Sequence, residues 1–222
     1  MNSNVEVGLQ VAENLLQIKA IELKPANPFT WASGLKSPIY CDNRKTLSYP
    51  KIRTYIRQQF VAAIQAKYGT PDLIAGVATG GIAIGALIAQ EMGLPFAYVR
   101  SEAKKHGLGN QVEGVIEANQ KVVVIEDLVS TGKSSLSAVA ALRETGAEIV
   151  GMLAIFTYDF DSAKQAFEEA GIELQTLTNY HLLLEEALKK EYITEDQLET
   201  LKQWRESPAA WSEAFLTARA NG

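Results

Sequence analysis

Residues 122–134, VVVIEDLVSTGKS, constrain the fold of this chain more than any other segment. Four consecutive apolar residues at 122–125 are typical of a parallel strand that is buried on both faces. Two acids, Glu126 and Asp127, follow directly, and small residues then lead into the helical pattern SLSAVAALRETG. A strand, a short turn and a helix in this order predict an α/β fold with a central parallel sheet.

The turn between this strand and this helix has the chemistry of an anion site. The first N–H groups of a helix have no partner inside it, and the helix dipole favours negative charge there. Ser130, Thr131 and Ser134 add hydroxyl donors, and Gly132 lets the backbone approach a ligand. The two acids precede the turn at the carboxyl end of the strand, where ligands bind in open α/β sheets. Because carboxylates suit ribose hydroxyls or a Mg²⁺ shell, the segment predicts a phosphorylated sugar bound with Mg²⁺.

Two other interpretations of this segment are weaker. An ordinary strand–turn–helix with a capping Ser or Thr does not need two adjacent acids, which cost stability when no ligand is present. A nucleotide P-loop is suggested by GKS, but that motif requires a glycine five residues before Gly132. Asp127 occupies that position, so the match fails where the backbone must turn tightly.

A second strand–turn–helix pattern lies at residues 73–92, within DLIAGVATGGIAIGALIAQEMG. We expect a strand at 73–77 and an apolar helix at 82–92. The turn between them consists of Ala78, Thr79, Gly80 and Gly81. Alone, such a turn is weak evidence, because glycine pairs often serve only close helix–strand packing. Together the two turns predict a ligand with two separated phosphate groups.

Residues 100–114, RSEAKKHGLGNQVEG, interrupt every periodicity after an expected strand at 95–99. They carry Arg100, Lys104, Lys105 and His106, followed by three glycines. Cations on a glycine-rich segment beside a strand end are typical of a lid that closes on an anion. A solvated charged loop is the alternative, but the concentration of cations in an acidic chain favours the lid.

Composition restricts the class and the compartment. A chain of 222 residues with 47% hydrophobic content is enough for one domain with one sizeable core. A net charge of −5 argues against a general nucleic-acid-binding surface. The single cysteine, Cys41, excludes an internal disulfide and fits a reducing cytoplasm, and we interpret it as a small buried apolar residue rather than a nucleophile. We see no signal peptide or membrane-spanning run and therefore expect a cytoplasmic protein without a membrane contact.

The N-terminal part is expected to hold an amphipathic helix from residue 5 to about 21, followed by a small hood at about 22–48. Prolines and a glycine divide the hood into turns and short strands, including one at 38–41. Composition favours an ordinary surface hairpin. The functional alternative is a cover over a ligand that offers Tyr40 as an aromatic face.

The remaining core, at about 50–178, alternates helices and strands, and a helical tail follows at about 180–220. Thr194 and Gln197 form a capping box at one tail helix. Trp204 and Trp211 are expected to pack the tail on the body, so we interpret the tail as structural.

Four features recur in order: the hood, the ATGG turn, the R-S-E-A-K-K-H-G lid and the EDLVSTGKS loop. Together they resemble the orotate phosphoribosyltransferases, within the type I phosphoribosyltransferases, across nearly the whole chain. The lid is the most specific of the four, and SGLKSPIYCDNR resembles the hood of one bacterial branch. The resemblance implies that orotate and phosphoribosyl pyrophosphate give orotidine 5′-phosphate and pyrophosphate in de novo UMP synthesis. It also implies Mg²⁺ held mainly by the substrate, without a direct protein ligand, and a homodimer whose lid serves the neighbouring subunit's site.

The same resemblance assigns roles to residues. It implies that Glu126 and Asp127 hold the ribose hydroxyls and act in catalysis with Arg100, Lys104 and His106. The other implied contacts to phosphoribosyl pyrophosphate are Ala78, Thr79, Gly80, Gly81, Lys105, Leu128, Val129, Ser130, Thr131, Gly132, Lys133 and Ser134. Ser130 and Tyr40 are placed beside orotate, as is Tyr158, which stands where other branches carry an arginine for the orotate carboxylate. Those branches also carry cations where this chain has Ala32 and Ser101.

Two other classes of protein stay open on the sequence alone. One is a purine-type phosphoribosyltransferase, against which the orotate-type lid argues. The other is a regulator that keeps the fold only to sense phosphoribosyl pyrophosphate. Such regulators usually carry a basic surface or an added domain for nucleic acid, and the sequence shows neither.

Overall fold

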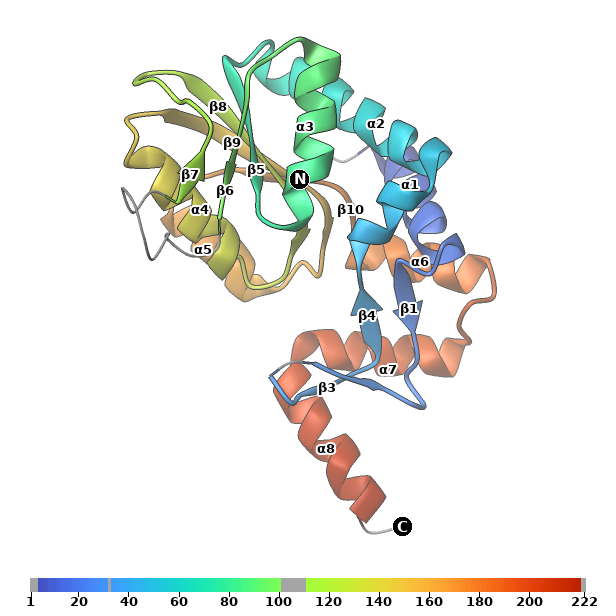
Figure 1. The fold of residues 1–222 in the computed structure, drawn as a ribbon. Helices are drawn as coiled ribbons and strands as arrows, with labels where there is room; N and C mark the ends of the chain where they lie inside the picture. Colours follow the sequence, from blue (N-terminus) through green and yellow to red (C-terminus); the bar gives the residue numbers. More distant parts are fainter. Residues whose placement is uncertain (1–3, 32, 101–110, 221–222) are drawn as a thin grey trace.

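A mostly parallel sheet of six strands lies at the centre of the structure (Figure 1). The computed structural model describes residues 4–31, 33–100 and 111–220. The strand order is β10-β9-β8-β5-β6-β7, and the short β7 runs antiparallel to β6. The strands are β5 (Leu73–Val77), β6 (Phe96–Val99), β7 (Val112–Glu113), β8 (Lys121–Val129), β9 (Glu148–Thr157) and β10 (Leu174–Asn179). The predicted α/β fold with a central parallel sheet is therefore confirmed.

Helices cover both faces of this sheet (Figure 1). One face packs against α1 (Val5–Gln17), α2 (Pro50–Tyr68), α3 (Gly80–Met92) and α6 (Tyr180–Lys189), and the other against α4 (Lys133–Arg143) and α5 (Asp161–Glu169). Side chains alternate between the two hydrophobic clusters along each strand, as the pleat requires. In β8, Val123 and Ile125 join the cluster of α1–α3, whereas Val122 and Val124 join that of α4 and α5. Burial on both sides explains why these strands are almost purely apolar.

The hood and the tail lie at one end of the molecule, below the sheet in Figure 1. The hood consists of two antiparallel pairs, β1 (Ile21–Leu23) with β4 (Ile39–Cys41) and β2 (Phe29–Thr30) with β3 (Lys36–Ser37), followed by the 3₁₀ helix η1 (Asn43–Ser48). The tail continues through α7 (Glu195–Glu206) and α8 (Pro208–Ala220), and α8 extends away from the body. Within the described ranges, none of the helices combines the length and hydrophobicity that crossing a bilayer requires.

The tail confirms two details of the sequence analysis. The capping box at the start of α7 is present in both directions between Thr194 and Gln197. Trp204 is fully buried in the larger hydrophobic cluster, and Trp211 packs against the same cluster while partly buried. The predicted first helix is too long, since α1 ends at Gln17 and β1 begins at Ile21. The sequence pattern predicts the last strand of the core at 172–177, and β10 begins and ends two residues later.

Strand β8 is longer than the sequence pattern suggests, and the difference shapes the site. Its pairing with β5 stops at Ile125, whereas its pairing with β9 continues to Val129. Glu126 and Asp127 therefore lie within the strand rather than after it. At the level of these acids β8 is unpaired on the β5 side, while its pairing with β9 continues.

Candidate functional site

The sheet topology brings the two predicted turns together. β5 and β8 are parallel neighbours, so the loops after them leave the same edge of the sheet side by side. β6 lies on the other side of β5, so the strand order changes direction between β5 and β8. Such a switch point is where open α/β sheets bind ligands.

A cavity of about 560 Å³ lies at this switch point. Its lining comes from both loops and from the end of β6, and consists of Val77, Ala78, Arg100, Leu128, Ser130, Thr131, Gly132, Lys133, Ser134, Ser137 and Ala138. All but Val77, Ser137 and Ala138 are residues that the sequence analysis assigns to phosphoribosyl pyrophosphate. Ser137 lies one helical turn beyond Ser134, so both hydroxyls lie on the same face of the helix. This spacing is the sequence signal that could have identified Ser137 as a site residue.

The N-terminus of α4 is built as an anion site. Gly132 precedes the helix in the left-handed conformation, with φ of 81°, and no side chain caps the first turn. The backbone N–H groups of this turn are therefore not occupied by a capping Ser or Thr, as the ordinary strand–turn–helix interpretation would require. Hydroxyls of the loop surround the same end, so a phosphate group would meet both backbone and side-chain donors.

The two acids of β8 point to opposite faces of the sheet. Glu126 is only 5% exposed, and the Ser135 hydroxyl on α4 lies 3.5 Å from its Oε2. The backbone N–H of Asp127 donates to Glu126 Oε1 at 3.2 Å. Burial, and then the neighbouring Asp127 carboxyl, raise the pKa of Glu126 to about 9. Without a ligand, Glu126 is therefore a neutral carboxylic acid at pH 7.

Asp127 lies against the other loop. A Cβ atom on Gly80 would stand only 2.1 Å from the carboxyl carbon of Asp127, so the two loops touch through these residues. The peptide between Ala78 and Thr79 in the first loop is cis. Gly80 has to be a glycine for Asp127 to keep its position. This contact explains the glycine at 80 more directly than helix–strand packing, which the neighbouring Gly81 serves against the carbonyl of Ile125.

Asn43 is a residue that the sequence analysis missed. It begins η1 in the hood, is 1% exposed, and its Nδ2 donates to the backbone carbonyl of Asp127 at 2.7 Å. The Cys41 thiol donates to Asn43 Oδ1 at 3.3 Å. Burial raises the pKa of Cys41 well above its usual range, so the sulfur is a protonated thiol and not a nucleophile. No sequence pattern distinguishes Asn43, because its partner lies 84 residues away.

The two aromatic residues expected beside orotate differ in exposure. Tyr40 is 38% exposed and packs beside Phe29, with ring centroids 5.4 Å apart. Tyr158 is 3% exposed, and burial raises the pKa of its phenol well above the usual range. Its ring packs against those of Trp31, Phe156, Phe160, Tyr180 and Trp204. Contacts of either residue with a base stay predictions.

Most of the predicted lid falls outside the described residues. This applies to Ser101, Lys104, Lys105 and His106, as well as to Ala32 in the hood. Arg100 is described and lines the cavity from the end of β6. Its N–H donates to the carbonyl of Gln111, and its Nη1 lies 3.7 Å from Glu113 Oε1. The base of the predicted lid is therefore attached to β7.

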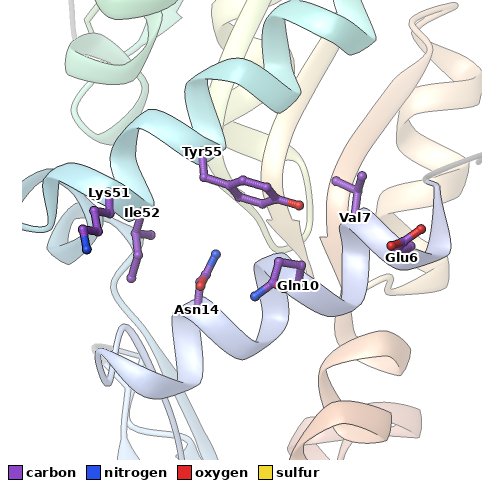
Figure 2. A pocket seen from close by; sticks show the side chains of 7 residues that line it. All are labelled: Glu6, Val7, Gln10, Asn14, Lys51, Ile52 and Tyr55. Atoms are coloured by element: carbon purple, nitrogen blue, oxygen red, sulfur yellow. The ribbon is translucent and has the colours of Figure 1, made fainter.

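A second cavity of about 560 Å³ lies between α1 and α2, away from these loops (Figure 2). Tyr55 and Ile52 of α2 face Gln10 and Asn14 of α1 across it. None of the residues that the sequence analysis assigns to substrate lines this cavity. The cavity at the switch point is therefore the candidate functional site.

The acids of the site fit a Mg²⁺ ion that arrives with its substrate. Among the described residues, no three His, Cys, Asp or Glu side chains gather to form a site of their own. Mg²⁺ commonly keeps several waters and takes one or two carboxylates together with substrate phosphates. Asp127 and Glu126, in β8 next to the lining residue Leu128, are the carboxylates that would help to balance such an ion.

Comparison with known proteins identifies the class. Residues 47–173 match the family described as phosphoribosyl transferase domain, and the chain belongs to this family. It is 58% identical over 200 residues to an orotate phosphoribosyltransferase of Phocaeicola vulgatus, covering 90% of this chain and 94% of that protein. It is also 56% identical over 202 residues to an orotate phosphoribosyltransferase of Listeria monocytogenes, covering 91% of this chain and 97% of that protein.

The structure agrees with these relatives. It superposes on the crystal structure of orotate phosphoribosyltransferase from Aeropyrum pernix with a TM-score of 0.72 at 26% identity, covering 83% of this chain and 99% of that one. The resemblance to the orotate phosphoribosyltransferases found in the sequence is confirmed. The fold, the family and the class of enzyme, a pentosyltransferase, agree across sequence, structure and relatives.

Proposed function

We propose that this protein transfers the 5-phosphoribosyl group from phosphoribosyl pyrophosphate to orotate, giving orotidine 5′-phosphate and pyrophosphate in de novo UMP synthesis. The observation that carries the proposal is a cavity lined by residues that follow β5, β6 and β8, next to the contact between Asp127 and Gly80. A ligand with two phosphate groups and a ribose between them needs this arrangement. Relatives named as orotate phosphoribosyltransferases, at 58% and 56% identity, support orotate as the base.

The residues of the chain divide the substrate into three parts. The N-terminus of α4, with Ser130, Thr131 and Ser134, holds the 5′-phosphate. The acids at 126 and 127 accept hydrogen bonds from the ribose hydroxyls. The backbone of the first loop approaches the pyrophosphate, and Mg²⁺, when bound, neutralises part of its charge. In this proposal Tyr40 and Ser130 contact the base.

The reaction itself is a displacement at C1 of the ribose. The bond from C1 to the pyrophosphate oxygen breaks, its electron pair leaves with pyrophosphate, and a ring nitrogen of orotate forms the new bond. C1 gains oxocarbenium character, so catalysis consists mainly of positioning and of stabilising charge on the leaving group. Arg100 and the lid cations Lys104, Lys105 and His106 supply that stabilisation in this proposal. A closed lid also excludes water, which would otherwise hydrolyse the sugar.

We further propose a cytoplasmic homodimer in which each lid serves the neighbouring subunit's site. The support is the resemblance of the lid to that of the orotate-specific family. Mixing two inactive variants, Lys104→Ala and Asp127→Asn, tests it. If lids act across the interface, each hybrid dimer holds one site in which both residues are intact, and activity returns to about a quarter of wild type on random mixing. Lids that act within their own subunit would leave the mixture inactive.

The direct test of function is loss of orotate absorbance with purified protein, phosphoribosyl pyrophosphate and Mg²⁺. Adenine, guanine, hypoxanthine and uracil are assayed in parallel, with pyrophosphate release as the shared measurement. We expect turnover with orotate alone. Turnover with a purine base would replace the base assignment and keep the sugar site. Tight binding of phosphoribosyl pyrophosphate without any turnover would identify a regulator instead.

A further inference from the structure

The hood depends on other parts of the chain for its position. It consists of two short two-stranded ribbons, and an isolated ribbon of this kind is marginally stable at best in water. The hood must therefore be fixed by packing against something else. Ile39 of β4 is buried in the core, and Arg53 of α2 donates to the carbonyl of Leu47 in η1. Two further contacts reach the C-terminal tail and the strand that carries the acids.

The first part of the tail attachment is aromatic. Trp204 on α7 meets Trp31 of the hood at 5.6 Å between centroids, in an edge-to-face arrangement. The same indole contacts Tyr158 at 5.7 Å and Phe160 at 5.8 Å, at the end of β9. Trp31 itself contacts Tyr158 at 5.8 Å, and its Nε1 donates to the carbonyl of Ile39 in β4 at 3.4 Å. Trp204 thus joins the hood to the end of β9.

The second part of the tail attachment is a hydrogen bond between elements distant in sequence. The backbone N–H of Lys36 in β3 donates to the Ser212 hydroxyl on α8 at 2.9 Å. Ser212 is 3% exposed, so water cannot easily replace this bond. Arg205, next to Trp204, donates through Nε to the carbonyl of Tyr158 at 3.3 Å and also donates to that of Asp159. The tail therefore holds both the hood and the chain that follows β9.

The attachment on the opposite side of the hood reaches the acids. Asn43 connects it to the carbonyl of Asp127, as described above. The two attachments have different neighbours. Asn43 contacts the acid proposed to bind the ribose, whereas the tail contacts β3 and Trp31 of the hood. In the proposed function, α4 holds the 5′-phosphate and the hood brings Tyr40 to the base.

We propose that the C-terminal tail positions the hood for the base, so that Ser212 and Trp204 are positioning residues for orotate binding. This inference rests on the proposed function. It assigns a role in base recognition to helices outside the matched transferase segment, 47–173, where the sequence analysis expects only structural packing. It also predicts that variants of the two attachments affect different substrates. Tail variants weaken orotate binding, and an Asn43 variant weakens phosphoribosyl pyrophosphate binding.

The test compares Ser212→Ala, Trp204→Phe and Asn43→Ala in the full-length protein. Two quantities are measured: the KM for orotate at saturating phosphoribosyl pyrophosphate, and the Kd of phosphoribosyl pyrophosphate with Mg²⁺ by calorimetry. We expect Ser212→Ala to raise the orotate KM about fivefold, the worth of one buried hydrogen bond, with the phosphoribosyl pyrophosphate Kd unchanged within about twofold. Trp204→Phe gives the same selectivity with a larger change, and Asn43→Ala shows the reverse pattern.

Two controls separate positioning from general damage. Thr217→Ala on α8 removes an exposed hydroxyl that bonds only within the helix, to the carbonyl of Glu213, and should change neither quantity. Ser212→Thr keeps the hydroxyl and should restore most of the orotate affinity. Melting temperatures of all variants report the purely structural loss.

The outcomes are distinct. A Ser212→Ala variant that melts earlier but keeps its orotate KM would overturn the proposal, as would equal losses for both substrates. A wild-type protein without orotate turnover would refute the proposed function instead, before any variant is compared. Rescue by threonine together with selective loss in alanine would establish the positioning role.

Discussion

The two loops that line the cavity share one architecture and differ in their chemistry. Each follows a parallel strand and begins a helix, and both emerge at the same switch point. The β5–α3 loop offers Ala78, Thr79, Gly80 and Gly81, with no ionisable side chain. The second unit places two acids at the end of β8, hydroxyls in the turn that follows, and Lys133 at the start of α4. The same strand–turn–helix arrangement therefore serves two purposes. The first turn lets the backbone approach the ligand, and the second places charged groups and hydrogen-bond donors around it.

A glycine sets the geometry of each loop, but against different neighbours. At Gly80 the neighbour is the Asp127 carboxyl, a functional group of the neighbouring strand β8. At Gly132 it is the ring of Phe167, a core side chain of α5. Adding a methyl group at each position therefore tests different things, namely the contact between the loops and the support beneath one loop.

The largest effect is expected for Gly80→Ala. The added Cβ would stand 2.1 Å from the carboxyl carbon of Asp127, so the short acid side chain has to move. A displacement of about 1 Å in a positioning group can cost on the order of 10²-fold, and we expect that loss in kcat/KM. Steady-state kinetics with orotate and phosphoribosyl pyrophosphate measures it.

Ala83→Gly is the matched control for this variant. It lies one turn further along α3 and costs helix stability of about 1 kcal/mol without approaching Asp127. Its kcat/KM should stay near that of wild type. If both variants lost activity equally, general destabilisation of α3 would be the cause. The contact between Gly80 and Asp127 would then not contribute to catalysis.

A smaller effect is expected for Gly132→Ala. Its φ of 81° is unfavourable for alanine by about 1–2 kcal/mol, and the new Cβ would stand 2.8 Å from a carbon of Phe167. The loop relaxes in the free protein and must be restored on binding, which weakens phosphoribosyl pyrophosphate about tenfold. Calorimetric titration measures the change in Kd.

Gly171→Ala provides the control. Gly171 also has a positive φ, of 62°, but a Cβ there would meet nothing within 4 Å. This variant carries similar backbone strain after α5, away from the cavity, and should leave the Kd unchanged. In Gly132→Ala, adding Phe167→Leu removes the ring and leaves the strain. Full recovery in that double variant would mean that the clash alone caused the loss.

The comparison also shows what the sequence could predict. Both strand–turn–helix units follow from local patterns: an apolar run, small residues and a helical period. Strand β5 was predicted with its observed limits, 73–77, because turn-forming residues bound it on both sides. The extension of β8 to Val129 was not, since it depends on pairing with β9, which ends at Thr157. A strand's length is set by its neighbours as well as by its own residues.

The site was predicted to the extent that its residues are neighbours in sequence. Ser130 to Ser134 line the cavity together because they are consecutive, in the turn after β8 and the first residues of α4. Asn43 and Ser212 were missed, because their partners lie 84 and 176 residues away. The burial of Glu126 was missed for a different reason. Two adjacent acids look equivalent in a sequence, yet the pleat of β8 sends them to opposite faces.

Ser137→Ala is expected to have a small effect. Its hydroxyl lines the cavity one turn into α4, beyond the uncapped N-terminus. If it donates to the bound phosphate, its removal raises the Kd of phosphoribosyl pyrophosphate several-fold, within the range of a hydrogen bond to a charged group. The exposed Ser207, between α7 and α8, offers a hydroxyl far from the cavity for comparison. An unchanged Kd would limit the anion site to the loop itself.

The smallest effect concerns the two acids and appears in stability rather than activity. Folding raises the pKa of Glu126 from its ordinary value near 4.5 to about 9, first through burial and then through Asp127. Between these values the native state keeps a proton that the unfolded chain releases, so the free energy of unfolding falls as pH rises.

Glu126→Gln imitates the neutral acid at every pH. Wild type and variant should therefore melt together near pH 5 and separate progressively toward pH 9, with the variant more stable. Melting curves without ligand across this range measure the difference. If the melting temperatures of wild type and variant changed in parallel with pH, Glu126 would be ionised in the free protein. The interpretation of Glu126 as a buried neutral acid would then be wrong.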